Sequence, residues 1–354
     1  MSVDVRSVQR STVALLVGLS ALSLTACGSS GASASSSSSG GSLTGQSITV
    51  YSGQHKQTMS ALVTDFTART GVKVQLRSGD EAELANQLLV EGPASPADVF
   101  VAENPPALTK LEGKGRLAKV NAATLAAVPA ADSAGQGDWV GVSARQAAFV
   151  YNTGKLTAAQ APASVKDLAS PAWKGKLGVA PSETDFTPIV TRMIKDQGVA
   201  ATKTWLEALK ADAKVYGSNE DLVAAVNRGE VSGGVIDHYY WYRLRDEQGT
   251  GNVHSALASF AKGDPGALVD VSGAAVLSSG RHQAAAQAFL AYLVSKPAQQ
   301  IIATSESYEY PLLAGVQDSR LTRSLQDSGP VASAADLGDG SAALQLMQSV
   351  GLLS

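Results

Sequence analysis

The sequence predicts an α/β protein made of two hinged lobes with mixed, mostly parallel sheets. Short apolar runs typical of strands alternate with amphipathic helix patterns in two successive series, and such alternation favours parallel strands covered by helices. A long extended stretch follows each series, at residues 139–153 and 266–279, so strands are expected to cross between two lobes. The expected folded part, from Ser47 to Ser354, is also longer than a single core usually supports. This architecture predicts a hinge, with a ligand in the cleft between the lobes.

Each element follows from a local pattern. In the first helix, Met59, Leu62, Val63 and Phe66 repeat at i, i+3, i+4 and i+7, and Gly71 ends it. The strands either alternate apolar and polar residues or are apolar throughout. The first series therefore reads strand, helix, strand, helix, strand at residues 47–52, 55–71, 72–78, 81–92 and 97–103. The second reads strand, helix, helix, strand, helix, strand at residues 176–182, 189–198, 199–211, 213–217, 220–229 and 233–237, and helices from Gln283 onward close the chain.

The N-terminus predicts export and a lipid anchor. Residues 1–26 form an expected signal peptide, because the apolar run at 12–24 is too short for a membrane span of roughly 20 residues. The string Leu-Thr-Ala-Cys that ends at Cys27 resembles a bacterial lipobox, which is cleaved before a cysteine that carries a diacylglycerol. The alternative is an ordinary secretory signal with a chance cysteine. Residues 27–46, the expected lipidated cysteine and its linker, are rich in Ser and Gly and predict a flexible tether.

Composition excludes several classes of function. The net charge is −3, from 28 basic and 31 acidic residues without a basic run, so nucleic acid is not an expected partner. Cys27 is the only cysteine, which excludes a disulfide framework. The chain contains neither a nucleophile elbow nor an HExxH string, so we expect a monomeric binding protein and not an enzyme.

Polar side chains follow the predicted strands at the edge where open α/β sheets bind ligands. These side chains are His55, Glu103, the run Ser182-Glu183-Thr184, Asn219 and the pair Tyr239-Tyr240. Phenolate and carboxylate are hard oxygen donors, and with no thiolate at hand this set favours a hard, highly charged cation such as Fe(III). A free phenol has a pKa near ~10, so a strongly polarising ion is needed to displace its proton.

Two neighbouring tyrosines at a loop-to-helix junction can aim at one point, and two phenolates with one carboxylate neutralise three positive charges. Ser182, Thr184 and Asn219, with helix N-terminal amides, would suit an oxyanion. The plainer interpretation is a solvated histidine, a surface glutamate and aromatics that only pack. Trp241 and Tyr242 are expected to pack in any case, and His238 is expected to be structural.

Several strings resemble the periplasmic ferric-ion-binding proteins of bacterial iron ABC importers. They are ITVYSGQH at 48–55, SPADVFVAE at 95–103 and GGVIDHYYWYRLRDEQG at 233–249, and the similarity continues through WVGVSAR, VYNTGKL, PAWKGKLG, DPGALVDVSGAAVL and EYPL. It covers nearly all of residues 47–315 and is loose beyond. The resemblance implies a type II periplasmic-binding-protein fold, with one lobe formed by 47–146 plus 270–318 and the other by 147–269 plus 319–354.

The resemblance also implies a ferric ion bound by His55, Glu103, Tyr239 and Tyr240, with a synergistic anion, usually phosphate, at Ser182–Thr184 and Asn219. The chain departs from the family there, because Glu183 and Asp237 place negative charge where a phosphate would sit. Carbonate, a carboxylate ligand or Glu183 itself are the alternatives, and His238 is a further candidate donor. The implied function is a lipid-anchored, extracytoplasmic receptor that delivers Fe(III) to an ABC permease of the cell membrane.

Two other functions stay open on the sequence alone. The same fold binds organic or anionic solutes such as a phosphonate, a thiamine-like cation or a polyamine, with the tyrosines as a stacking platform. A metal-dependent hydrolase would instead use a His, Glu and Asp set to activate water. A tyrosinate-to-iron charge-transfer colour distinguishes the Fe(III) receptor from both of these alternatives.

Overall fold

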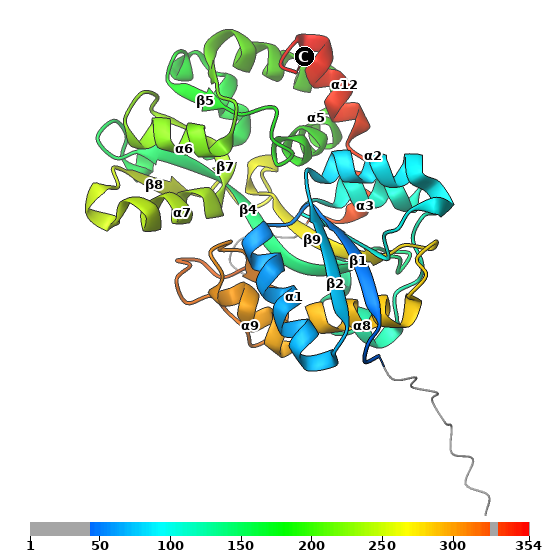
Figure 1. Ribbon diagram of the computed structural model, residues 1–354. Helices are drawn as coiled ribbons and strands as arrows, with labels where there is room; N and C mark the ends of the chain where they lie inside the picture. Colours follow the sequence, from blue (N-terminus) through cyan, green and yellow to red (C-terminus); the bar gives the residue numbers. More distant parts are fainter. Residues whose placement is uncertain (1–42, 326–331, 354) are drawn as a thin grey trace, which may run out of the picture. The chain divides into compact units, whose positions relative to one another are not determined.

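One mixed sheet organises residues 43–325 and 332–353, the parts of the chain that the computed structural model describes (Figure 1). Its strand order is β2-β1-β3-β9-β4-β7-β5-β6, and β8 and β10 also pair with β4. The strands are β1 (Ser47–Ser52), β2 (Lys73–Ser78), β3 (Val99–Ala102), β4 (Val140–Asn152), β5 (Leu177–Val179), β6 (Lys214–Val215), β7 (Gly233–Asp237), β8 (Ser255–Ala258), β9 (Val269–Val276) and β10 (Tyr310–Pro311).

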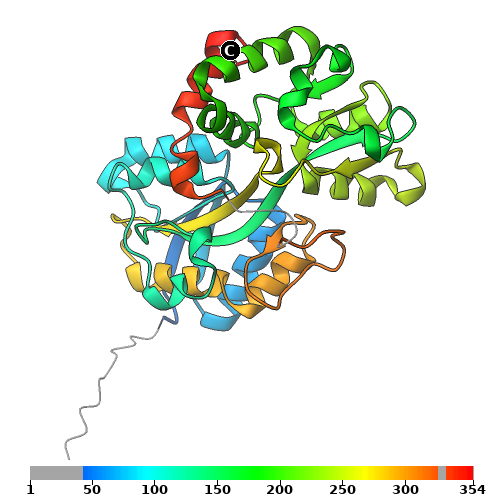
Figure 2. The same cartoon turned by 180° about the vertical axis from the view of Figure 1, so that it is seen from behind.

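Parallel pairs form the two flanks of the sheet, and antiparallel pairs join them. β1 runs parallel to β2 and β3, and β5 runs parallel to β6 and β7. The two predicted extended stretches are β4 and β9, which pair antiparallel with each other. On its other edge, β4 pairs antiparallel with β7, and β9 pairs antiparallel with β3. Seen from behind, β4 and β9 run side by side from one flank to the other (Figure 2). All 13 residues of β4 are buried, including the polar or charged Ser143, Arg145, Gln146 and Asn152.

The described helices are α1 (Lys56–Thr70), α2 (Glu81–Glu91), α3 (Pro105–Glu112), α4 (Ala122–Leu125), α5 (Phe186–Asp212), α6 (Asn219–Asn227), α7 (His238–Gln248), α8 (Gln283–Leu293), α9 (Lys296–Thr304), α11 (Ala334–Leu337) and α12 (Ser341–Val350). The predicted helices are present as α1, α2, α5, α6 and the helices after Gln283, whereas α3 and α4 were not predicted. Gly71 ends α1 in the left-handed region, at φ 71°. Gly198, at φ 84° and ψ 164°, breaks α5 into the two helices that the sequence predicts.

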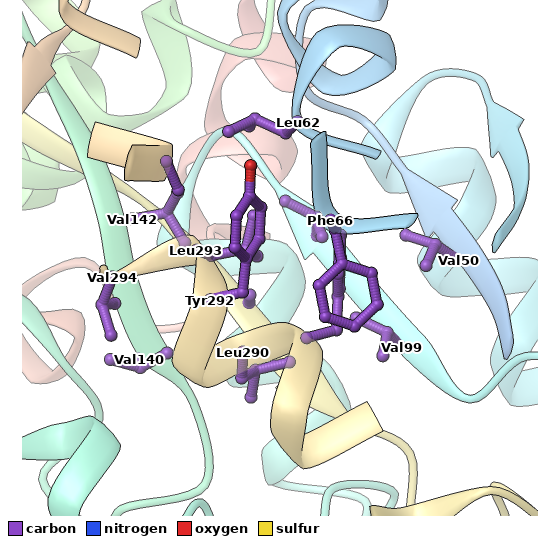
Figure 3. Close-up of a cluster of buried hydrophobic side chains, with 14 of the residues drawn as sticks. Val50, Leu62, Phe66, Val99, Val140, Val142, Leu290, Tyr292, Leu293 and Val294 are labelled. Atoms are coloured by element: carbon purple, nitrogen blue, oxygen red, sulfur yellow. The ribbon is translucent and has the colours of Figure 1, made fainter. Parts of the chain in front are cut away.

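The buried apolar residues fall into groups on either side of the crossing strands. Between α1 and α8, Phe66 packs edge-on against Phe289 at 4.9 Å between ring centroids. The Phe66 ring also lies 5.3 Å from that of Tyr292, and both side chains belong to the cluster shown in Figure 3. On the other flank, Phe149 and Trp173 join a cluster that includes Met347 of α12. The C-terminal helix α12 therefore belongs with α5, against which it packs (Figure 1).

The start of the chain lies mostly outside the described residues. The predicted signal peptide 1–26, Cys27 and the linker as far as residue 42 are all in that part. Within the expected linker, the described residues contact the domain, because Leu43 packs against the core and the Gly45 amide donates to the Gly71 carbonyl. Across the described ranges, no helix combines the length and apolar character needed to cross a membrane.

Candidate metal centre

The adjacent tyrosines lie in the first turn of α7, directly beyond the carboxyl end of β7. Tyr239 and Tyr240 are buried, and their ring centroids are 4.2 Å apart. Both phenols donate hydrogen bonds to the same atom, Asp185 Oδ2, over 3.2 Å and 3.1 Å. Because the pair begins a helix and does not continue the strand, the two hydroxyls converge instead of pointing to opposite faces.

His55 and Glu103 meet beside these rings. His55 follows β1 and precedes α1, Glu103 follows β3, and His55 Nδ1 lies 3.4 Å from Glu103 Oε1. The His55 ring is edge-on to Tyr239, with 4.9 Å between centroids. His55 Nε2 is buried and meets no hydrogen-bond partner among the described residues. The structure thus brings all four predicted ligands together, from the ends of three strands.

A close approach of two elements makes this junction possible at Gly53, just before His55. A Cβ atom on Gly53 would lie 2.5 Å from Cβ of Glu81, the first residue of α2. Glu81 in turn accepts hydrogen bonds from the backbone and side-chain nitrogens of Asn104, over 2.9 Å and 2.7 Å. The glycine therefore lets α2 hold the residue that follows Glu103.

Asp185 is the functional residue that the sequence reasoning missed. It precedes α5, is buried, and accepts from Asn219 Nδ2 at 3.4 Å in addition to both phenols. Its second oxygen, Oδ1, has no hydrogen-bond partner within the described part of the chain. Its only sequence signal is that it extends the run Ser182-Glu183-Thr184 by a fourth acidic or hydroxyl residue, one position beyond the predicted run.

The residues predicted to bind an anion are hydrogen-bonded to other residues of the protein. Ser182 is exposed and donates to the Gly217 carbonyl at 3.3 Å. Thr184 Oγ1 accepts from Asn104 Nδ2 at 3.3 Å. Glu183 Oε1 accepts from the Asn219 amide, the first of α6, at 3.3 Å. A carboxylate of the chain itself thus occupies the helix N-terminus where an oxyanion was expected.

Electrostatics keep the phenols protonated and the imidazole neutral. Burial raises the pKa of Tyr239 and of Tyr240 well above the ordinary value, and the Asp185 carboxylate raises both further. This agrees with the phenols being the donors toward Asp185. Burial also lowers the pKa of His55, which leaves its ring neutral and able to bind a metal. Burial raises the pKa of Glu103 well above its usual range, against the opposing charge of Arg145.

His238, the further candidate donor, has both ring nitrogens engaged. Nδ1 accepts from the Gln146 amide at 3.2 Å, so Nε2 carries the proton and donates to the Tyr308 carbonyl at 2.8 Å. Burial lowers its pKa to about 3, and the ring stacks on Tyr310 at 4.7 Å. His238 is therefore a structural residue, and Tyr242 is buried as expected.

A cavity of about 100 Å³ lies beside Asn104 and Thr184, and another of about 10 Å³ is lined in part by Asp185, Asn219 and Asp237. Both are below the roughly 300–1,000 Å³ of sites for organic ligands, and none of the four predicted metal ligands lines either one. A cavity of about 610 Å³ lies elsewhere, between α1 and α9, and none of the predicted ligands lines it. Among the described residues, no three His, Cys, Asp or Glu side chains are grouped to hold a metal ion, so a metal here depends on the phenols.

The comparisons with known proteins fit this geometry. The model of the bacterial extracellular solute-binding protein family matches residues 61–329. The chain belongs to this family. This solute-binding protein is 40% identical over 309 residues to the Fe(3+)-binding periplasmic protein of Serratia marcescens, covering 87% of the chain and 91% of the relative. It is 38% identical over 311 residues to the major ferric iron-binding protein of Neisseria meningitidis serogroup B, covering 86% and 93%.

Solved structures of iron-binding proteins share the fold. Iron-bound HitA from Pseudomonas aeruginosa superposes with a TM-score of 0.82 at 39% identity, over 86% of this chain and 99% of that one. The Trichodesmium protein in complex with iron and citrate superposes with a TM-score of 0.75 at 28% identity, over 86% and 99%. The predicted two-lobed periplasmic-binding-protein fold is confirmed.

Proposed function

We propose that this protein is an extracytoplasmic receptor that binds Fe(III) as its cargo and delivers it to an ABC importer. The convergence of two buried phenols on one carboxylate, beside His55 and Glu103, carries the proposal. Relatives whose names specify ferric iron support it. We assign no catalytic role to the chain, because the names of these relatives denote binding proteins.

The proposed ligands of the ferric ion are His55, Glu103, Tyr239 and Tyr240. In this proposal Asp185 joins them once the ion has replaced the phenol protons, because His55, Glu103 and Asp185 are not grouped to hold a metal ion without the phenols. Asp185 Oδ2 accepts a hydrogen bond from each phenol. An ion that replaces the two phenol protons would therefore lie within reach of the Asp185 carboxylate. Two phenolates and two carboxylates then offset the three charges of iron with one negative charge to spare. In this proposal Asp185 takes the role of the synergistic phosphate or carbonate, and Glu183 fills the N-terminus of α6.

We further propose that one lobe comprises 47–146 plus 270–318 and the other 147–269 plus 319–354, with the hinge in β4 and β9. The separate apolar clusters and the packing of α12 on α5 support this division. The lipobox-like string supports a lipid anchor at Cys27 on the cell membrane. The partner is then an ABC permease of that membrane, met by a monomeric receptor.

The decisive experiment is metal analysis with a visible spectrum of protein purified from iron-replete medium. We expect close to one iron per chain and a tyrosinate-to-iron charge-transfer band. A colourless protein that binds a phosphonate, a thiamine-like cation or a polyamine tightly would overturn the proposal.

Iron affinity is expected to fall steeply as the pH falls. Both phenols have a raised pKa and carry protons near neutral pH, so each bound ion must displace two of them. The apparent association constant should therefore drop by at least roughly 100-fold per pH unit around neutrality, because the raised pKa of Glu103 can only add to the protons that the ion displaces. His55 has a lowered pKa and does not add to this competition until the medium is more acidic. Titration against a chelator of known pH dependence measures the slope, and a flat profile would rule out phenolate ligands.

A further inference from the structure

One arginine lies at the middle of the metal centre without belonging to the predicted ligands. Arg145 is on β4, the strand that crosses between the flanks of the sheet, and its side chain is 0% exposed. A guanidinium is permanently charged, and its burial is costly unless partners surround it. Its partners therefore show what this buried charge stabilises.

The direct partners of Arg145 come from both flanks. Nε lies 3.2 Å from Asp237 Oδ2, at the end of β7, and 3.7 Å from Asp185 Oδ1. On the other flank the guanidinium donates to the backbone carbonyl of Glu103. The Arg145 side chain thus contacts three residues of the centre. They are the proposed ligand Asp185, the backbone of the proposed ligand Glu103, and Asp237, which directly precedes α7 and its two tyrosines.

A second route leads from Arg145 to His55. The Nη1 atom of Arg145 donates to Glu309 Oε1 at 3.4 Å, and Glu309 Oε2 accepts from Gln54 Nε2 at 2.9 Å. The other amide atom, Gln54 Oε1, accepts from the backbone nitrogen of His55 at 2.6 Å. Glu309 and Gln54 are both buried, so solvent does not loosen this chain of hydrogen bonds.

We propose that Arg145 is a positioning residue of the metal centre, whose planar fork sets the mutual placement of the ligand-bearing segments from both flanks. This inference rests on the proposed function. Arg145 does not touch the iron in this account. It acts on the ion by fixing Glu103 through its carbonyl, Asp185 through its carboxylate and His55 through Glu309 and Gln54.

Lysine cannot replace this arrangement, although it carries the same charge. A guanidinium presents five donors in one plane, whereas an ammonium is a point charge on a flexible stem. Arg145→Lys therefore keeps the counter-charge and loses the fork. Glu309→Gln instead keeps the guanidinium of Arg145 and weakens the hydrogen bonds that link it through Glu309 and Gln54 to His55.

The test measures iron release from the full-length protein to excess citrate at fixed pH, together with the charge-transfer maximum. We expect Arg145→Lys to release iron about 10- to 100-fold faster, as outer-shell substitutions at metal sites do, with a shifted band. Glu309→Gln should show a smaller increase of the same sign. If Arg145→Lys does not fold, Glu309→Gln carries the test alone, and release at the wild-type rate would then refute the role.

Arg320→Lys is the matched control. Arg320 also combines a carboxylate, Asp318 at 2.6 Å, with two backbone carbonyls, those of Ala303 and Ser305, away from the predicted ligands. It should lose stability but keep the wild-type band and release rate. If Arg145→Lys behaves in the same way, Arg145 is only structural and the inference is wrong. A wild-type protein without any band would instead contradict the proposed function itself.

Discussion

A Tyr239→Phe, Tyr240→Phe double variant is expected to lose both the charge-transfer band and measurable Fe(III) binding. The substitution removes two of the anionic oxygens on which the proposed centre depends, and phenylalanine offers no replacement donor. Each single variant should keep a weaker, shifted band, because one phenolate remains. Titration with Fe(III) followed by visible absorbance measures the effect. A double variant that still binds iron in a coloured complex would remove the basis of the proposed function.

The fold of the double variant should survive. Both rings keep their packing, and the lost phenol donors leave the buried Asp185 less satisfied, at a cost of about 1–3 kcal/mol of unfolding free energy. Tyr242→Phe is the matched control on the same helix. Its hydroxyl is hydrogen-bonded to Thr322 Oγ1 at 2.7 Å and not to Asp185, so this variant should bind iron with an unchanged band.

Asp185→Ala is expected to weaken iron binding by more than about 100-fold in anion-free buffer, beyond the usual loss from an outer-shell change. The variant removes a negatively charged ligand and opens space between the Asn219 amide group and Arg145. A small oxyanion can enter that space, so added phosphate or carbonate should restore part of the affinity. The wild-type affinity should not depend on these anions.

The control for this prediction is Asp196→Ala, which removes a carboxylate that pairs with Arg192 on α5 and leaves the centre untouched. It should bind iron as the wild type does, with and without phosphate. An Asp185→Ala protein that binds iron tightly in anion-free buffer would show that Asp185 is not a ligand. If the wild-type protein requires phosphate to bind iron tightly, a synergistic anion is a ligand after all, and the proposal that Asp185 replaces it is wrong.

The sequence by itself determined most of the strands and helices that lead to the site, together with the polar residues at their ends, but not α3, α4, β8 or β10. Periodicity and apolar runs report local backbone and burial, so strands such as β1, β3 and β7 and helices such as α1 were predictable. Strand-end geometry then placed His55, Glu103 and the tyrosine pair at one edge of the sheet. Two crossing stretches also predicted the hinge architecture before any distance was known.

Only the tertiary structure decided which side chains meet there. Asp185 accepts from both phenols because the α5 N-terminus faces the first turn of α7, more than fifty positions later in the chain. Arg145 reaches Glu103, Asp237 and Glu309 through the register of β4 with its neighbours, and Glu183 fills the expected anion position through α6. Such contacts join residues that are remote in sequence, and a local pattern does not say which remote residue a strand end or a helix N-terminus will face.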